Sequence, residues 1–245
     1  VRALLTRHIA ELKAEGDPAA AGGGQLMNWL RKCDGAAAVV GTSPALMGGA
    51  GLFINTVVYG RSSDPASLLA EFKSTTEGVN GKTEEGVSFT SSYKPGAATV
   101  AGTPVDEWQV TMKMDPSDPN ATNANMAQSM LFGAKGGPGG YVAPAQGGVV
   151  MTLGRNSALM ETALKAAQGE GGTFAADAGV QAVASSLPEG RTFEGYIGVR
   201  DILNMALPMM AMFGMGAIDI EVPADLQPIG LGATSREGGL RVAIM

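Results

Sequence analysis

The sequence predicts an α+β fold, in which a mixed but mainly antiparallel sheet carries its helices on one face. Three observations predict this class. Segments 87–93 and 106–114 alternate apolar and polar residues with a period of two, which is typical of antiparallel strands with one covered face. Segments with helical spacing of apolar residues are inserted between such strands. Hydrophobic residues make up 45% of the chain, which is enough for a sizeable core.

The first half of the chain predicts two helices and then a strand-rich region. The expected elements are helices over 1–15 and 25–33, a buried strand over 35–43, a strand over 51–62, a helix over 63–78, and strands over 87–93 and 106–114 joined by a turn at 94–97. The helix over 63–78 has the clearest signals, because Asp64 is a good N-cap and Pro65 suits the first helical position. Its apolar face consists of Leu68, Leu69 and Phe72.

The second half alternates helices and strands more regularly. The expected elements are a helix over 123–133, a mobile glycine-rich loop over 133–140, a strand over 147–154, helices over 156–169 and 179–188, a strand over 192–200, a Met-rich helix within 201–220, and a C-terminal hairpin with strands over 227–235 and 240–245. Asn156 is expected to cap the helix that follows it.

The predicted organisation is an N-terminal helical segment over 1–34 and one α+β domain over 35–245. Segments 55–72 and 194–210 resemble each other, because each gives a strand, an arginine, an acidic cap and a helix. This similarity suggests an internal duplication. The chain starts at Val1 and ends in what reads as a strand, so we expect it to be the C-terminal part of a longer protein.

Composition excludes several classes of function. The formal net charge is −6 and the sequence contains no run of basic residues, which argues against nucleic acid and anionic lipid headgroups as partners. A single cysteine, Cys33, excludes an internal disulfide and cysteine-based zinc sites. No stretch reaches the roughly 18 consecutive apolar residues of a membrane helix.

The sequence contains no catalytic motif. His8 is the only histidine, no G-x-S-x-G elbow is present, and a zinc hydrolase site would need more than one histidine. Segment 76–83, "TEGVNGKT", nearly matches a phosphate-binding loop, but Thr76 replaces its first glycine and the segment follows a helix instead of a strand. We therefore interpret it as a helix end and a polar turn.

Acidic pairs and the lone cysteine give no stronger signal. The pairs Glu84–Glu85, Asp115–Asp118 and Asp219–Glu221 are interpreted as solvated turns and strand ends. Segment 115–122 lacks the spaced ligands and the bidentate glutamate of a calcium loop. Cys33 is interpreted as a half-buried structural thiol, although the adjacent basic residues could lower its pKa. No catalytic residue, metal site or cofactor is predicted.

The Met-rich stretch is the one candidate binding segment. Its methionines are Met205, Met209, Met210, Met212 and Met215. On a helix, residues 205, 209 and 212 form one stripe, and packing into a core explains such a stripe. A flexible apolar surface for a ligand or partner is a second interpretation, and Cu(I) bound by the thioethers is a third.

Four segments carry a resemblance to a known family. They are "GGAGLFINTVVYGRSSDPASLLAEFK", "GGVVMTLGRNSALMETAL", "LPEGRTFEGYIGVRDILNM" and "LQPIGLGATSREGGLRVAIM". With these segments the chain resembles a family of uncharacterised exported bacterial proteins that are rich in Ala, Gly and Met. The resemblance implies export to the periplasm or cell envelope and a longer parent chain. It implies no activity and no functional residues.

The sequence thus predicts a non-enzymatic structural or binding module of an exported, envelope-associated protein. The expected partner is a protein or an apolar small molecule. The alternative is a carrier that encloses a lipid or hydrophobic peptide between the sheet and the Met-rich helix. A carrier requires a pocket of several hundred Å³ or more, whereas a structural module is packed solid.

Overall fold

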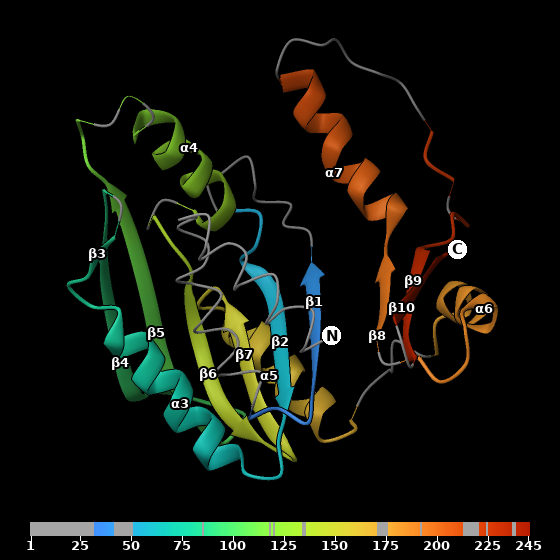
Figure 1. Cartoon of the computed structure of the whole chain (residues 1–245), viewed down its shortest axis with the longest axis horizontal. Coiled ribbons are helices and arrows are strands. Elements are labelled where there is room, and N and C mark those ends of the chain that lie inside the picture. The colour runs from blue at the N-terminus through green and yellow to red at the C-terminus, as the bar shows by residue number, and fades with distance from the viewer. Residues whose placement is uncertain are drawn as a thin grey trace. The chain divides into compact units, whose positions relative to one another are not determined.

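The computed structural model describes residues 32–41, 51–84, 86–117, 119, 121–133, 136–170, 176–191, 193–212, 221–223, 225–236 and 239–245 (Figure 1). The helices expected over 1–15 and 25–33, and with them nearly all of the predicted N-terminal segment 1–34, lie outside these residues. The chain divides into two compact units, residues 2–170 and 171–245. The domain expected over 35–245 therefore spans both units, and each unit is described by itself below.

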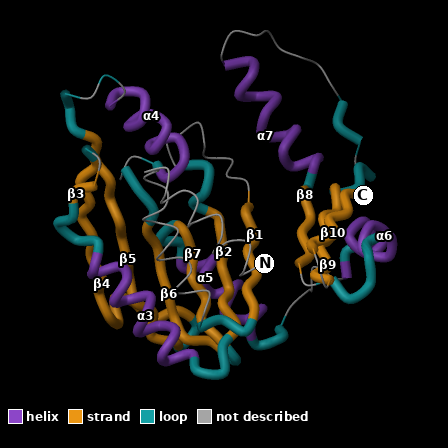
Figure 2. Tube along the Cα trace, viewed as in Figure 1, coloured by secondary structure: helices purple, strands orange, loops and turns teal. Residues whose placement is uncertain are grey.

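The first unit is built on a seven-stranded sheet with the strand order β1-β2-β7-β6-β5-β4-β3 (Figure 2). Its strands are β1 (Gly35–Gly41), β2 (Asn55–Arg61), β3 (Thr83–Glu84), β4 (Val87–Val100), β5 (Thr103–Met114), β6 (Gly139–Ala145) and β7 (Gly148–Leu153). All pairings between these strands are antiparallel. The predicted α+β class with a mainly antiparallel sheet is confirmed.

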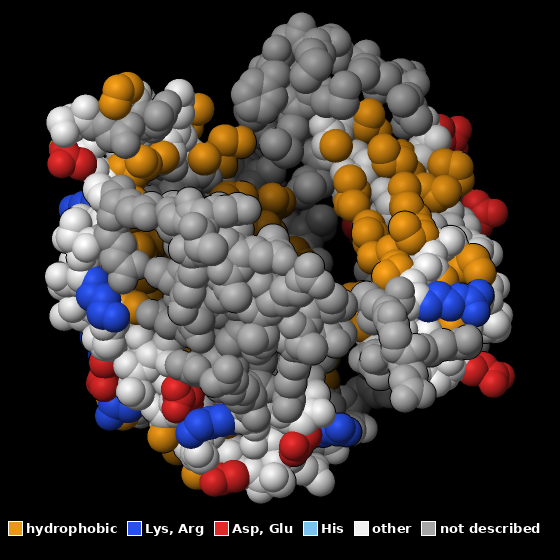
Figure 3. Space-filling view, viewed as in Figure 1, with side chains coloured by type: hydrophobic (Ala, Val, Ile, Leu, Met, Phe, Trp, Pro, Cys, Tyr) orange, Lys and Arg blue, Asp and Glu red, His pale blue; other side chains and the backbone are white. Residues whose placement is uncertain are grey.

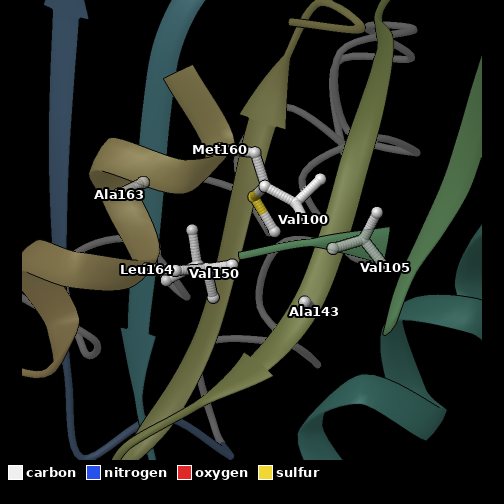
Figure 4. Packing of buried hydrophobic residues seen from close by; sticks show 7 residues of the cluster. All are labelled: Val100, Val105, Ala143, Val150, Met160, Ala163 and Leu164. Atoms are coloured by element: carbon white, nitrogen blue, oxygen red, sulfur yellow. The ribbon is translucent and has the colours of Figure 1, made fainter. Parts of the chain in front are cut away.

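Helices cover both faces of this sheet, which corrects the prediction of helices on one face only. Helix α3 (Pro65–Gly78) contributes Leu68 to a buried cluster that includes Val142 and Val149. Helix α5 (Ser157–Ala167) packs on the opposite face, against the neighbouring residues Ala143 and Val150 (Figure 4). Consecutive strand residues point to opposite faces, so consecutive apolar residues in β6 and β7 make both faces apolar.

The predicted caps of these two helices are confirmed. The Asp64 side chain accepts a hydrogen bond from the Ser67 backbone N–H at 3.0 Å. Asn156 accepts hydrogen bonds from the N–H groups of Ala158 and Leu159 at 3.1 Å. Each cap satisfies backbone donors that the first helical turn leaves free, and this fixes where the helix begins.

Strand β1 is not the buried strand that its sequence suggested. Val39 is 60% exposed and Val40 is 58% exposed, although they point to opposite faces. The reason is position, because β1 is an edge strand of the sheet and pairs only with β2 among the described strands. A short apolar run shows that a strand can be covered, but it does not show where in the sheet the strand lies.

The chain reversal predicted at 94–97 also lies elsewhere. Strand β4 continues through this segment with a register shift between Lys94 and Ala98, and Gly96 has a φ of 59°. The chain turns at Ala101 and Gly102, whose φ values are 47° and 77°. Segment 94–97 is thus a bulge, in which glycine supplies a conformation that other residues adopt with strain.

The glycine-rich segment 133–140, which was expected to be a mobile loop, is packed against β5 where it is described. It follows helix α4 (Ala121–Phe132), and Gly137 and Gly140 are buried. The backbone N–H of Val110 donates to the Pro138 carbonyl at 2.8 Å. A Cβ at Gly137 would lie 2.1 Å from the Val110 carbonyl oxygen. Here glycine allows close approach of two backbones.

The second unit contains α6 (Ala178–Ser186), β8 (Phe193–Ile197), α7 (Val199–Met212), β9 (Ile229–Arg236) and β10 (Gly239–Ile244). The strands form an antiparallel sheet in the order β10-β9-β8. The predicted C-terminal hairpin is therefore confirmed. Segments 55–72 and 194–210 both form a strand followed by a helix, but β2 lies inside its sheet whereas β8 lies at an edge.

Candidate functional site: the apolar face of the C-terminal sheet

The methionines singled out in the sequence fall only in part within the described structure. Met205, Met209, Met210 and Met212 belong to α7, but their side chains lie outside the described residues. Met215 lies outside them altogether. Packing, ligand binding and copper binding by this stretch therefore remain predictions.

Two other segments have the structural roles that the sequence indicated. Thr76 is buried in α3, and its hydroxyl donates to the Phe72 carbonyl at 2.9 Å. The segment that resembles a phosphate loop is thus the end of a helix. Cys33 is 2% exposed and belongs to the cluster beneath α3. Within the described ranges, no group of three or more His, Cys, Asp or Glu side chains is arranged to hold a metal ion.

The second unit presents a sheet face on which every side chain that the structure describes is apolar. Residues paired directly across antiparallel strands point to the same face. The register places Phe193 beside Ala233, and Ala233 beside Val242. Continuing along the strands, the described residues on this face are Phe193, Gly195, Ile197, Ile229, Leu231, Ala233, Val242 and Ile244. We call this set the apolar face.

Helix α6 covers the opposite face of the same sheet. A Cβ at Gly230 would lie 2.3 Å from Val183 Cγ1, and a Cβ at Gly232 would lie 3.3 Å from Leu187 Cδ2. These glycines allow α6 to approach the sheet closely. Five large side chains on the apolar face remain exposed, with exposed fractions of 48% for Phe193, 38% for Ile197 and Ile229, 60% for Val242 and 68% for Ile244, whereas Ala233 at the centre is 5% exposed.

The apolar surface also includes part of α7. Figure 3 shows apolar side chains gathered over β8 and α7. Helix α7 begins after the single residue Gly198 that follows β8, and Ile202 in its first turn is 45% exposed. Contiguous exposed apolar patches of this kind mark interaction sites more often than isolated exposed residues do.

Two charged residues of the strands, Glu194 and Arg241, lie on the α6 side of the sheet. Glu194 pairs with Gly232 and so shares the α6 side. Arg191 Nε lies 2.5 Å from Glu194 Oε2, and the Tyr196 hydroxyl also donates to this carboxylate. These hydrogen bonds, that of Arg191 first, lower the pKa of Glu194 below its usual value. The carboxylate is therefore already paired and does not interrupt the apolar face.

The apolar face has no side-chain donors or acceptors, so its chemistry is limited to burying apolar surface. Sequence reasoning identified the strands but not this face. A signal was present in "IGLGA", where large apolar residues alternate with glycines. The glycine positions indicate the side that a helix approaches, and the large residues then point the other way.

A small hollow in the first unit lies at one end of its sheet. Its lining includes Phe53, Phe132, Pro138 and Leu153, and its volume is about 10 Å³. This is roughly the space that one water molecule needs. It is far smaller than the several hundred Å³ of a typical ligand pocket.

A polar cluster in the first unit is held together by contacts among its own members. Arg155 Nε lies 2.9 Å from Glu107 Oε1, and another guanidinium nitrogen of Arg155 donates to Gln109 Oε1 at 3.1 Å. The Gln109 amide donates in turn to the carbonyls of Gly137 and Pro138 at 3.1 Å. The contact with Glu107 is an ion pair and not a well-aligned hydrogen bond. The cluster joins β5, the glycine-rich segment and the start of α5.

Comparisons of the chain with models of protein families, with curated proteins and with solved structures find no match. The resemblance to exported bacterial proteins therefore stays a prediction. Of the helices in the described ranges, none combines the length and the apolar character needed to cross a membrane.

Proposed function

We propose that this chain is a non-enzymatic binding module of an exported, envelope-associated protein, and that it binds its partner through the apolar face. The observation that supports this proposal is the one-sided covering of the C-terminal sheet. Helix α6 packs on one face, while five large apolar side chains of the other face are 38–68% exposed. A surface of this kind favours removal from water by a partner.

The size of the apolar face suggests modest affinity. A patch of a few hundred Å², at about 25 cal/mol per Å², contributes on the order of 10 kcal/mol when it is fully covered. Association costs roughly 4–15 kcal/mol in lost freedom of motion, so little net free energy remains from this patch alone. We therefore expect reversible binding, or binding assisted by contacts outside the apolar face.

The second candidate function is a carrier of an apolar ligand, such as a lipid or a hydrophobic peptide. The open sheet face and the exposed Ile202 of the Met-rich helix favour it, since they belong to the same unit and are close in sequence. In this function the ligand would lie between the sheet and α7, and the methionines would adapt to its shape.

Binding of the fluorescent probe anilinonaphthalene sulfonate to the whole chain tests the apolar face. The test variant is Ile197→Thr combined with Ile229→Thr, because these paired residues both lie on this face. The matched control is Val39→Thr with Val40→Thr on β1, which changes two residues of greater exposure in the other unit. We expect the test variant to lose most probe fluorescence and the control to lose little, with both still melting cooperatively.

Failure of the wild-type chain to bind the probe, or equal loss in both variants, would contradict binding by the apolar face. Native mass spectrometry then separates the two functions. A carrier should retain one lipid or peptide per chain after gentle purification. A protein-binding module should be released without a bound small molecule.

The proposed export and lack of enzymatic activity are supported by sequence alone. Export follows from the family resemblance, and the lack of activity from the missing catalytic motifs and the single histidine. Fractionation of the producing cells, followed by detection of the protein in cytoplasm, periplasm and membranes, tests the localisation. Recovery in the cytoplasm only would refute export.

A further inference from the structure

The outer edge of β10 combines free backbone groups with apolar side chains. Met245 and Gly230 exchange two backbone hydrogen bonds of 3.0 Å, so the N–H and C=O of Met245 point toward β9. Along an antiparallel strand, the backbone N–H and C=O groups of successive residues point alternately toward one side and the other. The N–H and C=O groups of Leu240, Val242 and Ile244 therefore point away from β9. Among the described strands, β10 lies at the edge of the sheet and has no neighbour on that side.

This edge lacks the features that usually prevent sheets from joining. Strand β10 contains no proline, and its register with β9 runs without a bulge from Gly239 to Ile244. Its one charged residue, Arg241, lies on the α6 side of the sheet, since it pairs with Thr234. Exposed edges without proline, bulges or inward charges favour pairing with another strand.

We propose that two copies of this chain associate by pairing their β10 strands antiparallel, about a two-fold axis at Val242. Val242 then pairs with Val242 of the second copy, and Leu240 pairs with Ile244 of the second copy. The outward-pointing groups of these residues form about six backbone hydrogen bonds between the copies. The product is a continuous six-stranded sheet with the apolar faces of both copies on one side.

The proposed register is compatible with the charges and with the exposure of β10. Arg241 lies opposite Ala243 of the second copy, so the two arginines are not directly opposed. Val242 and Ile244 are the most exposed residues of the apolar face, at 60% and 68%. In the dimer each gains a neighbour on its open side. A two-fold interface uses the same patch on both copies, and this strand meets that condition.

The inference deepens the proposed function, because it names a second copy as a partner of the C-terminal sheet. It uses the edge of the sheet and leaves the apolar face open. The two ideas can therefore fail separately. The Ile197→Thr, Ile229→Thr variant weakens the apolar face without changing the β10 edge, so this variant should still dimerise.

The first experiment is sedimentation velocity of the whole chain over a range of concentrations, with the variant Val242→Pro. Proline at 242 removes an N–H that points away from β9, and so it blocks the edge while keeping the β9–β10 hydrogen bonds. We expect a dimer in the wild type and a dissociation constant raised on the order of tenfold or more in the variant. A wild-type chain that stays monomeric up to the highest soluble concentration overturns the proposal.

The second experiment tests the register and does not depend on the folding of the proline variant. At the two-fold axis the Cα atoms of the two copies of residue 242 lie about 5.5 Å apart, within disulfide range. The two copies of residue 241 lie roughly 8 Å apart, beyond that range. Under mild oxidation Val242→Cys should form covalent dimers, whereas Arg241→Cys should not, with buried Cys33 present in both.

Equal cross-linking of the two cysteine variants overturns the proposed register. A dimer that persists in Val242→Pro but is lost in Ile197→Thr, Ile229→Thr overturns edge pairing in favour of packing between apolar faces. In that case binding by the apolar face would stand while the inference about β10 would fall.

Discussion

Replacing Trp108 with phenylalanine removes a buried indole N–H while keeping an aromatic ring in the core beneath α3. Trp108 is 5% exposed, and its Nε1 has no hydrogen-bond partner among the described residues. Its ring and the ring of Phe72 form a T-shaped contact with centroids 5.2 Å apart. It points to the same side of β5 as Val110, as the period-two pattern predicted.

Two opposing effects set the magnitude. Phenylalanine is smaller than tryptophan by a few tens of Å³, and at about 24 cal/mol per Å³ the resulting cavity costs roughly 1 kcal/mol. Removing a buried donor that has no partner recovers about 1–3 kcal/mol of desolvation cost. We therefore expect Trp108→Phe to leave the free energy of unfolding unchanged or to raise it by up to about 2 kcal/mol. Trp108→Ala also loses the contact with Phe72 and should cost about 3–5 kcal/mol.

Urea denaturation followed by far-ultraviolet circular dichroism measures both variants against the wild type. This signal does not depend on tryptophan fluorescence, which the substitutions change. A loss above about 2 kcal/mol for Trp108→Phe, approaching that of Trp108→Ala, would refute the reasoning. It would show that the indole N–H makes a hydrogen bond that stabilises the fold.

Three further predictions concern local features. Asp64→Ala removes the N-cap of α3 and should cost about 1 kcal/mol in urea melts, and no change would mean that the cap is dispensable. Gly140→Ala would place a Cβ 2.0 Å from a carbonyl oxygen of β7 and should lower the free energy of unfolding by more than about 3 kcal/mol. A Cβ at Gly78 would have no atom within 4 Å, so Gly78→Ala should raise the free energy of unfolding by roughly 0.4–1 kcal/mol. Glu194 has a lowered pKa in the folded protein, so its stabilising effect is present above pH 4.5 and is lost as pH falls through the lowered value. Thermal melts of Glu194→Gln and the wild type should therefore differ at pH 7 and converge in acid, and a constant difference would contradict this.

Features with local causes were predictable from the sequence. The helices after Asp64 and Asn156 begin where their caps predicted, because a cap acts within one turn. The alternation around Trp108 gave the correct face, because a strand sends alternate residues to opposite sides. These patterns depend on residues a few positions apart.

Features that depend on distant segments were not predictable in the same way. The apolar run of β1 could not show that it lies at an edge, and the glycines of 133–140 could not show that β5 lies against them. The helices were expected on one face because the alternating strand around Trp108 has one covered face. The consecutive apolar residues of β6 and β7 indicate instead a sheet with two apolar faces. Helices α3 and α5 pack on these opposite faces.

The candidate site shows how a sequence pattern gains meaning from register. Taken alone, "IGLGA" and "LRVAIM" predict a hairpin, and the exposure of its two faces is unknown. The register places Leu231 beside Ile244 on one face, and Gly230 on the other face contacts Val183 of α6. The glycines on one face accommodate the helix, so the large side chains opposite them must find a different neighbour or remain in water. The hydrogen bonds between Met245 and Gly230 then determine which backbone groups of β10 face outward. One arrangement of three strands thus defines both the apolar face and the free edge on which the proposed interactions depend.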